Sequence, residues 1–150
     1  MIVYGAAVHD FVAANIPGCE RGFGECQAIG FMDGGRIVAG VVYHNWSPET
    51  GVIELSAASV KRRWLNRSRL SEIFAYPFDR LQCRIAVARI AEGNRTARRI
   101  WRSLGADEYI IPALRTPTEA EVIYTLARET WQAGRFKGTR LGETERAGTA

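Results

Sequence analysis

Positive charge gathers between residues 61 and 102, in a stretch whose apolar spacing is typical of ordered helices and strands. Lys61 and eleven arginines stand there against only three acidic residues, so the stretch carries a net charge of +9 while the whole chain carries +4. A folded cationic segment of this kind favours the binding of anions. The first chemistry that the sequence predicts is therefore recognition of phosphate.

The densest part of this stretch is the loop from Val60 to Arg69, which precedes a predicted helix. A helix N-terminus presents unpaired N–H groups and a partial positive charge, both of which suit phosphate oxygens. The loop adds five cationic side chains, which are Lys61, Arg62, Arg63, Arg67 and Arg69. We therefore predict an anion-binding loop, with a solvated basic loop as the alternative.

The elements that must position this loop follow one another in mixed order. Hydrophobic periodicity predicts a helix up to about Ile16, a helix from about Arg69 that Pro77 bends or ends, and a helix capped by Asn94 and ended by Gly105. Strands are predicted at 27–32, 36–44, 52–59, 84–90, 109–112 and 121–127, with a hairpin turn at 33–35 and a polar loop at 45–51. This order predicts an α/β fold with one sheet and helices on its faces.

Composition narrows the class of protein. We expect a single domain over residues 1–133 and a disordered tail over 134–150. Cys19, Cys26 and Cys83 form no metal-binding or disulfide pattern, so we expect buried thiols in a reducing cytoplasm. No dinucleotide or P-loop motif and no membrane-length apolar run is present. The first ten residues lack the basic residues of a secretory leader, so we expect no leader and a cytoplasmic location.

Two segments resemble the GCN5-related N-acetyltransferases (GNAT family). Residues 93–106, GNRTARRIWRSLGA, are similar to the family's N-x-x-A-x-x-x-Y-x-x-x-G-F segment, and residues 63–68, RWLNRS, occupy the place of its [RQ]-x-x-G-x-[GA] pyrophosphate loop. The resemblance covers residues 27–127 and is nearest to short, arginine-rich members that phages and prophages carry. It implies a mixed, mostly antiparallel central sheet flanked by helices, with acetyl-CoA as co-substrate.

The resemblance also implies a set of cofactor-binding residues. They are Ser59, Val60, Lys61, Arg63, Asn66, Arg67, Ser68, Arg69, Asn94 and Trp101. The chain departs from the family pattern in two places. Asn66 and Ser68 replace glycines of the loop, and Trp101 replaces the tyrosine that usually serves as general acid. Because indole is no acid at neutral pH, another group or solvent must protonate the thiolate, or catalysis is absent.

Three residues near the strand at 52–59 are the predicted catalytic group. Glu54 lies in the strand that often supplies the family's general base, and Ser56 on the same face could orient a water molecule. His44 ends the neighbouring strand and is a second candidate for the base. The alternative for Glu54 is a carboxylate on an exposed face of the sheet.

The function we predict is acyl-CoA-dependent N-acyltransfer, which moves an acetyl group from acetyl-CoA to an amine. The expected partners are an amine acceptor, supplied by a small molecule, a protein or a nucleic acid, and a second copy of the chain in a homodimer, with no membrane. Two alternatives stay open at this point: a nucleic-acid-binding protein, which the pI of about 9.2 would suit, and a CoA-binding fold without turnover.

Overall fold

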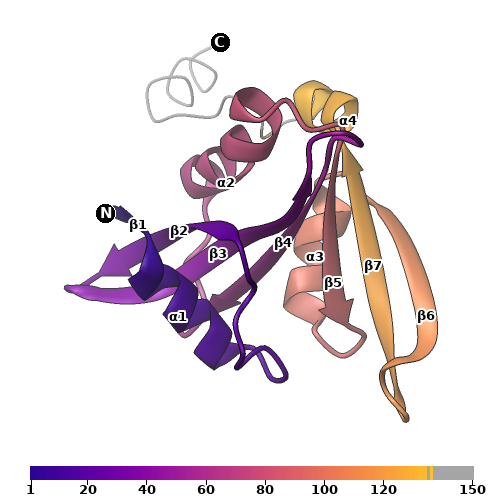
Figure 1. The fold of residues 1–150 in the computed structure, drawn as a ribbon, viewed down its shortest axis with the longest axis horizontal. Helices are drawn as coiled ribbons and strands as arrows, with labels where there is room; N and C mark the ends of the chain where they lie inside the picture. The colour runs from indigo at the N-terminus through magenta and orange to yellow at the C-terminus, as the bar shows by residue number, and fades with distance from the viewer. Residues whose placement is uncertain (135, 137–150) are drawn as a thin grey trace.

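The structure is a computed structural model that describes residues 1–134 and Phe136. Seven strands form one sheet in the order β1-β2-β3-β4-β5-β7-β6, in which β4 and β5 are parallel and all other neighbours are antiparallel (Figure 1). The strands are β1 Ile2–Tyr4, β2 Cys26–Asp33, β3 Arg36–Ser47, β4 Val52–Ser59, β5 Ile85–Ala91, β6 Asp107–Thr116 and β7 Glu119–Ala127. This is the mixed, mostly antiparallel sheet that the sequence predicts.

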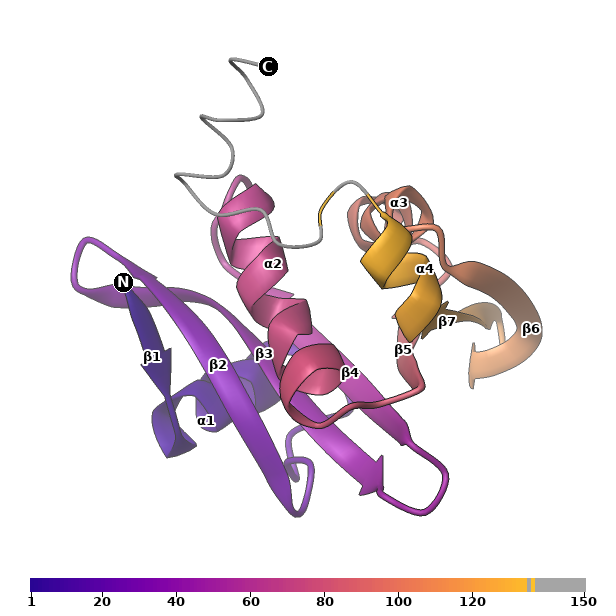
Figure 2. The same ribbon diagram turned by 90° about the horizontal axis from the view of Figure 1, so that it is seen from above.

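Helices cover both faces of the sheet. The elements are α1 Ala6–Asn15, α2 Arg67–Ala75, a π-helical turn at Tyr76–Arg80, α3 Arg95–Ser103 and α4 Arg128–Ala133. Helix α1 lies alone on one face, and α2, α3 and α4 lie on the other (Figure 2). Two separate hydrophobic clusters result, a small one under α1 and a large one under the other three helices.

Strand β4 illustrates how sequence alternation assigns residues to the two faces. Ile53 and Leu55 are buried in the large cluster, whereas Ala58 packs with the α1 cluster. Because successive side chains of a strand point to opposite faces, Glu54 and Ser56 lie on the α1 face. The polar residues predicted for catalysis are therefore separated from the main core by the sheet itself.

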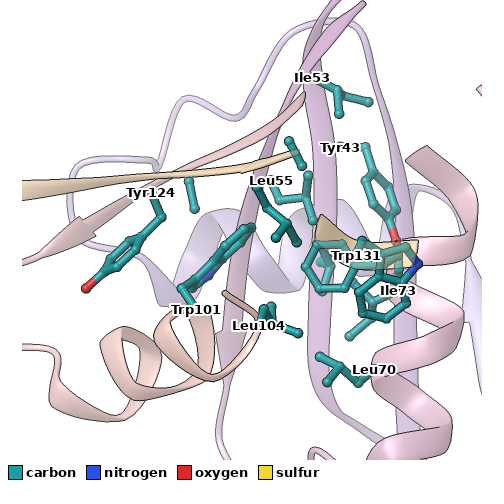
Figure 3. Packing of buried hydrophobic residues seen from close by; sticks show 14 of the residues in the cluster. Tyr43, Ile53, Leu55, Leu70, Ile73, Trp101, Leu104, Tyr124 and Trp131 are labelled. Atoms are coloured by element: carbon teal, nitrogen blue, oxygen red, sulfur yellow. Dashed lines mark hydrogen bonds between the residues drawn. The ribbon is translucent and has the colours of Figure 1, made fainter. Parts of the chain in front are cut away.

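Aromatic side chains fill the large cluster where α2, α3 and α4 meet the sheet (Figure 3). The ring of Trp101 stacks on Tyr124 at a centroid distance of 6.2 Å and meets Phe74 edge-on at 5.5 Å. Trp131 packs against the other side of Phe74 at 5.0 Å. Contacts of this kind, together with the area they bury, stabilise the position of α3 against the sheet.

Several element boundaries differ from the sequence prediction. Strand β1 and helix α4 were not predicted, because elements of three and six residues are too short to show a periodic pattern. Strand β3 continues to Ser47, which pairs with Val52, so part of the predicted polar loop at 45–51 is strand. The predicted tail lies outside the described residues except for Gly134 and Phe136.

The α-helix predicted from Arg69 begins at Arg67 and ends at Ala75, two residues before Pro77, which agrees with the expectation that this proline bends or ends it. The chain continues as the π-helical turn, in which the N–H of Leu81 donates to the carbonyl of Tyr76 at 3.0 Å. Proline lacks an N–H and crowds the carbonyl of the preceding turn, so a locally wider helix accommodates it at lower cost.

Helix α1 approaches the sheet closely because two glycines, Gly30 and Gly40, lie beneath it. A Cβ atom added at Gly40 would stand 2.8 Å from Val8 Cγ1 and 2.9 Å from Val12 Cγ2. We expect Gly40→Ala to lower the free energy of unfolding by about 1 to 3 kcal/mol, because the helix must move away from the sheet. Urea unfolding followed by circular dichroism measures this change.

Gly93→Ala is the matched control for this substitution. Its added Cβ would meet only Glu119 Oε2, at the ordinary contact distance of 3.6 Å. Equal stability losses in the two variants would contradict the close packing of α1.

Candidate functional site

The sheet separates between β4 and β5. The two strands pair at only three positions, Val52 with Ile85, Ile53 with Ala86 and Glu54 with Val87. Beyond these pairs they diverge (Figure 1), and no strand pairs with that side of β4 within the described part of the chain. Backbone N–H and C=O groups of β4 are thus left to bind water or a ligand. A cavity of about 900 Å³ opens at this point.

The three predicted catalytic residues come together on the α1 side of this cavity. His44 and Glu54 are register partners on β3 and β4. Nε2 of His44 lies 2.8 Å from Ser56 Oγ and 3.7 Å from Glu54 Oε2. Nδ2 of Asn45 donates to Glu54 Oε1 at 3.0 Å. The geometry forms a polar cluster in which both carboxylate oxygens of Glu54 are oriented by neighbours.

Burial controls the protonation of His44. The side chain of His44 is 7% exposed, and the ring of Phe23 packs against it at 4.8 Å. Desolvation lowers the pKa of His44 below its ordinary value, and the carboxylate of Glu54 opposes that shift only in part. The imidazole is therefore neutral at neutral pH and able to accept a proton.

Asn45 reaches Glu54 from an unusual backbone conformation. Its φ is 50°, and it lies where the β3–β4 register shifts between His44 and Ser47. A residue with a branched side chain at Cβ would be strained at this φ, whereas asparagine tolerates it. The irregularity at the end of β3 thus turns a side-chain amide toward the carboxylate.

The other side of the cavity is largely apolar. Its walls come from β4, the basic loop, α2 and α3, and they include Leu55, Trp64, Leu65, Leu70, Phe74, Ile100 and Trp101. Ser59 and Asn94 are the two predicted cofactor-binding residues with polar side chains that line it. Asn94 also caps α3, because its Oδ1 accepts from the N–H of Ala97 at 3.2 Å.

The basic loop leads from the end of β4 to the N-terminus of α2. Asn66 caps this helix by accepting from the N–H of Arg69 at 2.8 Å. Among the described residues, no acceptor is present for the N–H groups of Arg67 and Ser68. Two donors at the start of the helix are therefore free to bind an anion.

The cations of this loop differ in their availability. Lys61 and Arg69 both bind Asp33, at 2.7 and 3.1 Å, and Arg69 also donates to the carbonyl of Trp64. Arg62 lines the cavity, and Arg67 lies over the ring of Phe136 at 5.5 Å. The remaining predicted residues of the loop lie outside the cavity lining: Val60, Lys61, Arg63, Asn66, Arg67, Ser68 and Arg69. Their role in cofactor binding stays a prediction.

Trp101 lines the cavity but is 7% exposed and belongs to the aromatic core. No tyrosine lines this cavity in the described part of the chain. The hydroxyl of Tyr124, next to Trp101, donates to Glu108 at 2.6 Å and accepts from Arg98 at 3.2 Å. Burial, and then the bond to Glu108, raise the pKa of Tyr124. The cavity therefore has no phenolic acid near Trp101.

Three residues with charged side chains line the cavity but were not among the predicted site residues. Arg89 on β5 and Arg115 on β6 both bind Glu121 on β7. Glu121 is only 2% exposed. Its position at the start of the apolar run that continues through Val122 and Ile123 was the available signal, but a sequence does not show which cations will meet a buried carboxylate.

The described residues give no support for a metal site or for a membrane-spanning helix. They contain no group of three histidine, cysteine or acidic side chains that could hold a metal ion. Among the described helices, none is both long enough and apolar enough to cross a membrane.

Comparisons with known proteins identify the fold. By sequence, neither a family model nor a curated protein matches the chain. By structure, a protein assigned as an acetyltransferase matches with a TM-score of 0.67 at 17% identity, over 87% of this chain and 84% of that one. A point mutant of the spermidine N-acetyltransferase SpeG from Vibrio cholerae gives 0.64 at 10% identity, over 73% and 70% of the two chains.

A GCN5-related N-acetyltransferase from Brucella melitensis matches with a TM-score of 0.56 at 17% identity, over 73% of this chain and 54% of that one. Together with the order and direction of the seven strands, these matches show that the chain has the fold of the GCN5-related N-acetyltransferases.

Proposed function

We propose that this protein is an N-acetyltransferase that uses acetyl-CoA and an amine acceptor. One observation carries the proposal: the opening between β4 and β5 joins an apolar chamber beside α2 and α3 to the polar cluster of Glu54, His44 and Ser56. Two substrates that approach from opposite faces of the sheet would meet in this opening. Holding reactants together in this way lowers the barrier of a bimolecular transfer.

The apolar chamber and the basic loop suit coenzyme A. The N–H groups of Arg67 and Ser68, with the guanidinium groups of Arg62 and Arg63, would hold its phosphates. Trp64, Leu65 and Ile100 would contact its uncharged arm. When bound, acetyl-CoA supplies the thioester whose acetyl group is transferred.

Glu54 is the proposed general base. Its side chain is 20% exposed while that of His44 is 7% exposed, so the carboxylate is the more accessible of the two. As the amine nitrogen attacks the thioester carbonyl, the C–N bond forms, the C–S bond breaks, and the nitrogen gives a proton to Glu54. The leaving thiolate takes a proton from water. Unpaired N–H groups of β4 would stabilise the negative charge on the carbonyl oxygen.

The ion pairs of the basic stretch argue against the alternative that the protein binds nucleic acid. Five of the twelve cations between residues 61 and 102 bind carboxylates in the structure, namely Lys61, Arg69, Arg89, Arg98 and Arg102. The basic stretch is therefore divided among several acidic partners, whereas non-specific nucleic-acid binding needs a continuous cationic surface.

The first test is calorimetric titration with CoA and with 3′-dephospho-CoA. We expect binding of CoA that weakens without the 3′-phosphate. The double variant Arg62→Ala/Arg63→Ala should weaken CoA binding by about tenfold or more, because it removes both guanidinium groups proposed to hold the phosphates, and each charge-assisted bond contributes about 1.5 to 3 kcal/mol.

Arg36→Ala is the control, because Arg36 is exposed in the β2–β3 hairpin and its removal also lowers the net charge. Equal losses of affinity in the hairpin and loop variants would mean that general charge, and not the loop, attracts CoA.

The role of Glu54 is tested by Glu54→Gln. Glutamine retains an oxygen for Asn45 but accepts no proton, so we expect kcat to fall about 100-fold with CoA affinity unchanged. Release of the CoA thiol in the presence of an amine acceptor measures kcat.

Glu49→Gln, in the exposed turn between β3 and β4, is the matched control and should retain full activity. A Glu54→Gln variant with the wild-type kcat would remove this residue from the role of base.

His44 also predicts a pH dependence of stability. Because the pKa of His44 is lower in the folded chain than in the unfolded chain, the unfolded chain binds the proton more readily. Stability should therefore fall as the pH drops below the ordinary histidine pKa of about 6.5. Urea unfolding at about pH 7.5 and about pH 5 should show a smaller loss in His44→Gln than in the wild type. The same loss in both proteins would contradict the buried, neutral state of His44.

A further inference from the structure

The structure assigns a second charged group to the cavity, formed by Arg89, Arg115 and Glu121. Nε and Nη2 of Arg89 both donate to Oε2 of Glu121, at 3.1 and 2.6 Å. Nη1 of Arg115 donates to Oε1 of Glu121 at 2.9 Å. Two guanidinium groups thus surround one buried carboxylate, and the group carries a net charge of +1. All three residues line the cavity.

The fold places this charged group on the same face of the sheet as Glu54. Val87 is the register partner of Glu54, and Arg89 stands two residues further along β5 on the same face of the sheet. Arg115 comes from a bulge in β6, where residues 112–115 interrupt the pairing with β7 and Ala113 has a φ of 55°. The bulge brings Arg115 to Glu121, so β5, β6 and β7 each contribute one member.

The guanidinium groups have more donors than Glu121 uses. In the described part of the chain, no acceptor is present for Nη1 of Arg89 or for Nε and Nη2 of Arg115. The side chains of Arg89 and Arg115 are 47% and 25% exposed. Burial alone would raise the pKa of Glu121, but the bonds from the two arginines outweigh it and leave the pKa below its ordinary value. Glu121 is therefore ionised and holds both guanidinium groups in place.

Arg98 offers a comparison, because its guanidinium group has no unused nitrogen. Arg98 binds the hydroxyl of Tyr124, the carbonyl of Glu92 and the carboxylate of Glu108, so each of its nitrogens has a partner. Arg98, its neighbour Arg102 and Glu108 do not line the cavity. Arg89 and Arg115, in contrast, line the same cavity as Glu54 and keep donors that Glu121 does not use.

We propose that the acceptor is a small molecule that carries both an amine and an anionic group, either a carboxylate or a phosphate. Arg89 and Arg115 hold the anionic group, and the amine is presented to Glu54. Planar guanidinium groups bind both kinds of anion through paired hydrogen bonds. A polyamine would instead bring a second ammonium group toward two guanidinium groups. This proposal rests on the proposed transferase function.

The test compares matched acceptors in an assay of CoA thiol release. The panel contains the common amino acids, their carboxamides, phosphoethanolamine, ethanolamine and spermidine. We expect kcat/KM for an acceptor with an anionic group to exceed that of its uncharged counterpart by about tenfold or more. Whether an amino acid or phosphoethanolamine reacts faster distinguishes carboxylate from phosphate. Spermidine or a carboxamide as the preferred acceptor would overturn the proposal.

Arg115→Gln tests the residue assignment, because Glu121 keeps Arg89 as its counter-ion in that variant. In this variant we expect kcat/KM for the anionic acceptor to fall to about that of its uncharged counterpart. Arg115→Lys should restore part of the difference. Arg102→Gln breaks a comparable ion pair outside the cavity and should keep the wild-type preference. An unchanged preference in Arg115→Gln would overturn the assignment.

A binding measurement separates failure of this proposal from failure of the transferase function. In the presence of CoA, the protein is titrated with N-acetylated amino acids, with phospho-N-acetylethanolamine, and with the matching uncharged amides. Tighter binding of the anionic ligands supports the anion site even where no turnover is seen, and equal binding overturns it. Absence of CoA binding would overturn the transferase function on its own.

Discussion

The separation of β4 from β5 is the constraint on which the rest of the structure depends. A sheet loses hydrogen bonds wherever two strands part, and the exposed backbone groups must find other partners. Here the strands part after three residue pairs, and the opening is covered on one face by α2 and α3 and on the other by the segment that follows α1. The cavity and the chamber beside α3 follow from this one interruption in the sheet, and the polar cluster that the β3–β4 register forms lies beside it.

Much of the fold could be predicted because its central elements have strong local patterns. Strand β4 alternates so regularly that its bounds and its two faces were predicted correctly, and the helix capped by Asn94 was also found. The short elements β1 and α4 were missed, and so was the π-helical turn that follows the end of α2 at Ala75. In each of these cases the outcome depends on packing against distant parts of the chain.

The candidate site was predictable in part, for a related reason. Glu54, Ser56 and His44 were grouped from the family resemblance and from the alternation within β4, and the register of β3 with β4 brings them together in the structure. The carboxylate partners of the arginines could not be predicted, because their long side chains reach residues that are distant in the sequence. Asp33 binds Lys61 and Arg69 from another hairpin, and Glu121 binds Arg89 and Arg115 from two other strands. A count of charges therefore predicts anion binding, but it does not show which cations already have carboxylate partners.

Acidic residues divide the cations of this protein into two kinds. Arg62 and Arg63, in the loop before α2, make no ion pair within the described part of the chain, whereas Arg89 and Arg115 are anchored by a buried carboxylate that offsets only part of their charge. An arginine that is held by one side chain loses less conformational freedom when it binds a ligand, because its position is already fixed. Partial neutralisation also limits repulsion between the two guanidinium groups. The result is a cavity with a cationic site on each side of the sheet and a carboxylate, Glu54, near the opening between them. That arrangement suits the transfer of a group between two molecules that both carry negative charge.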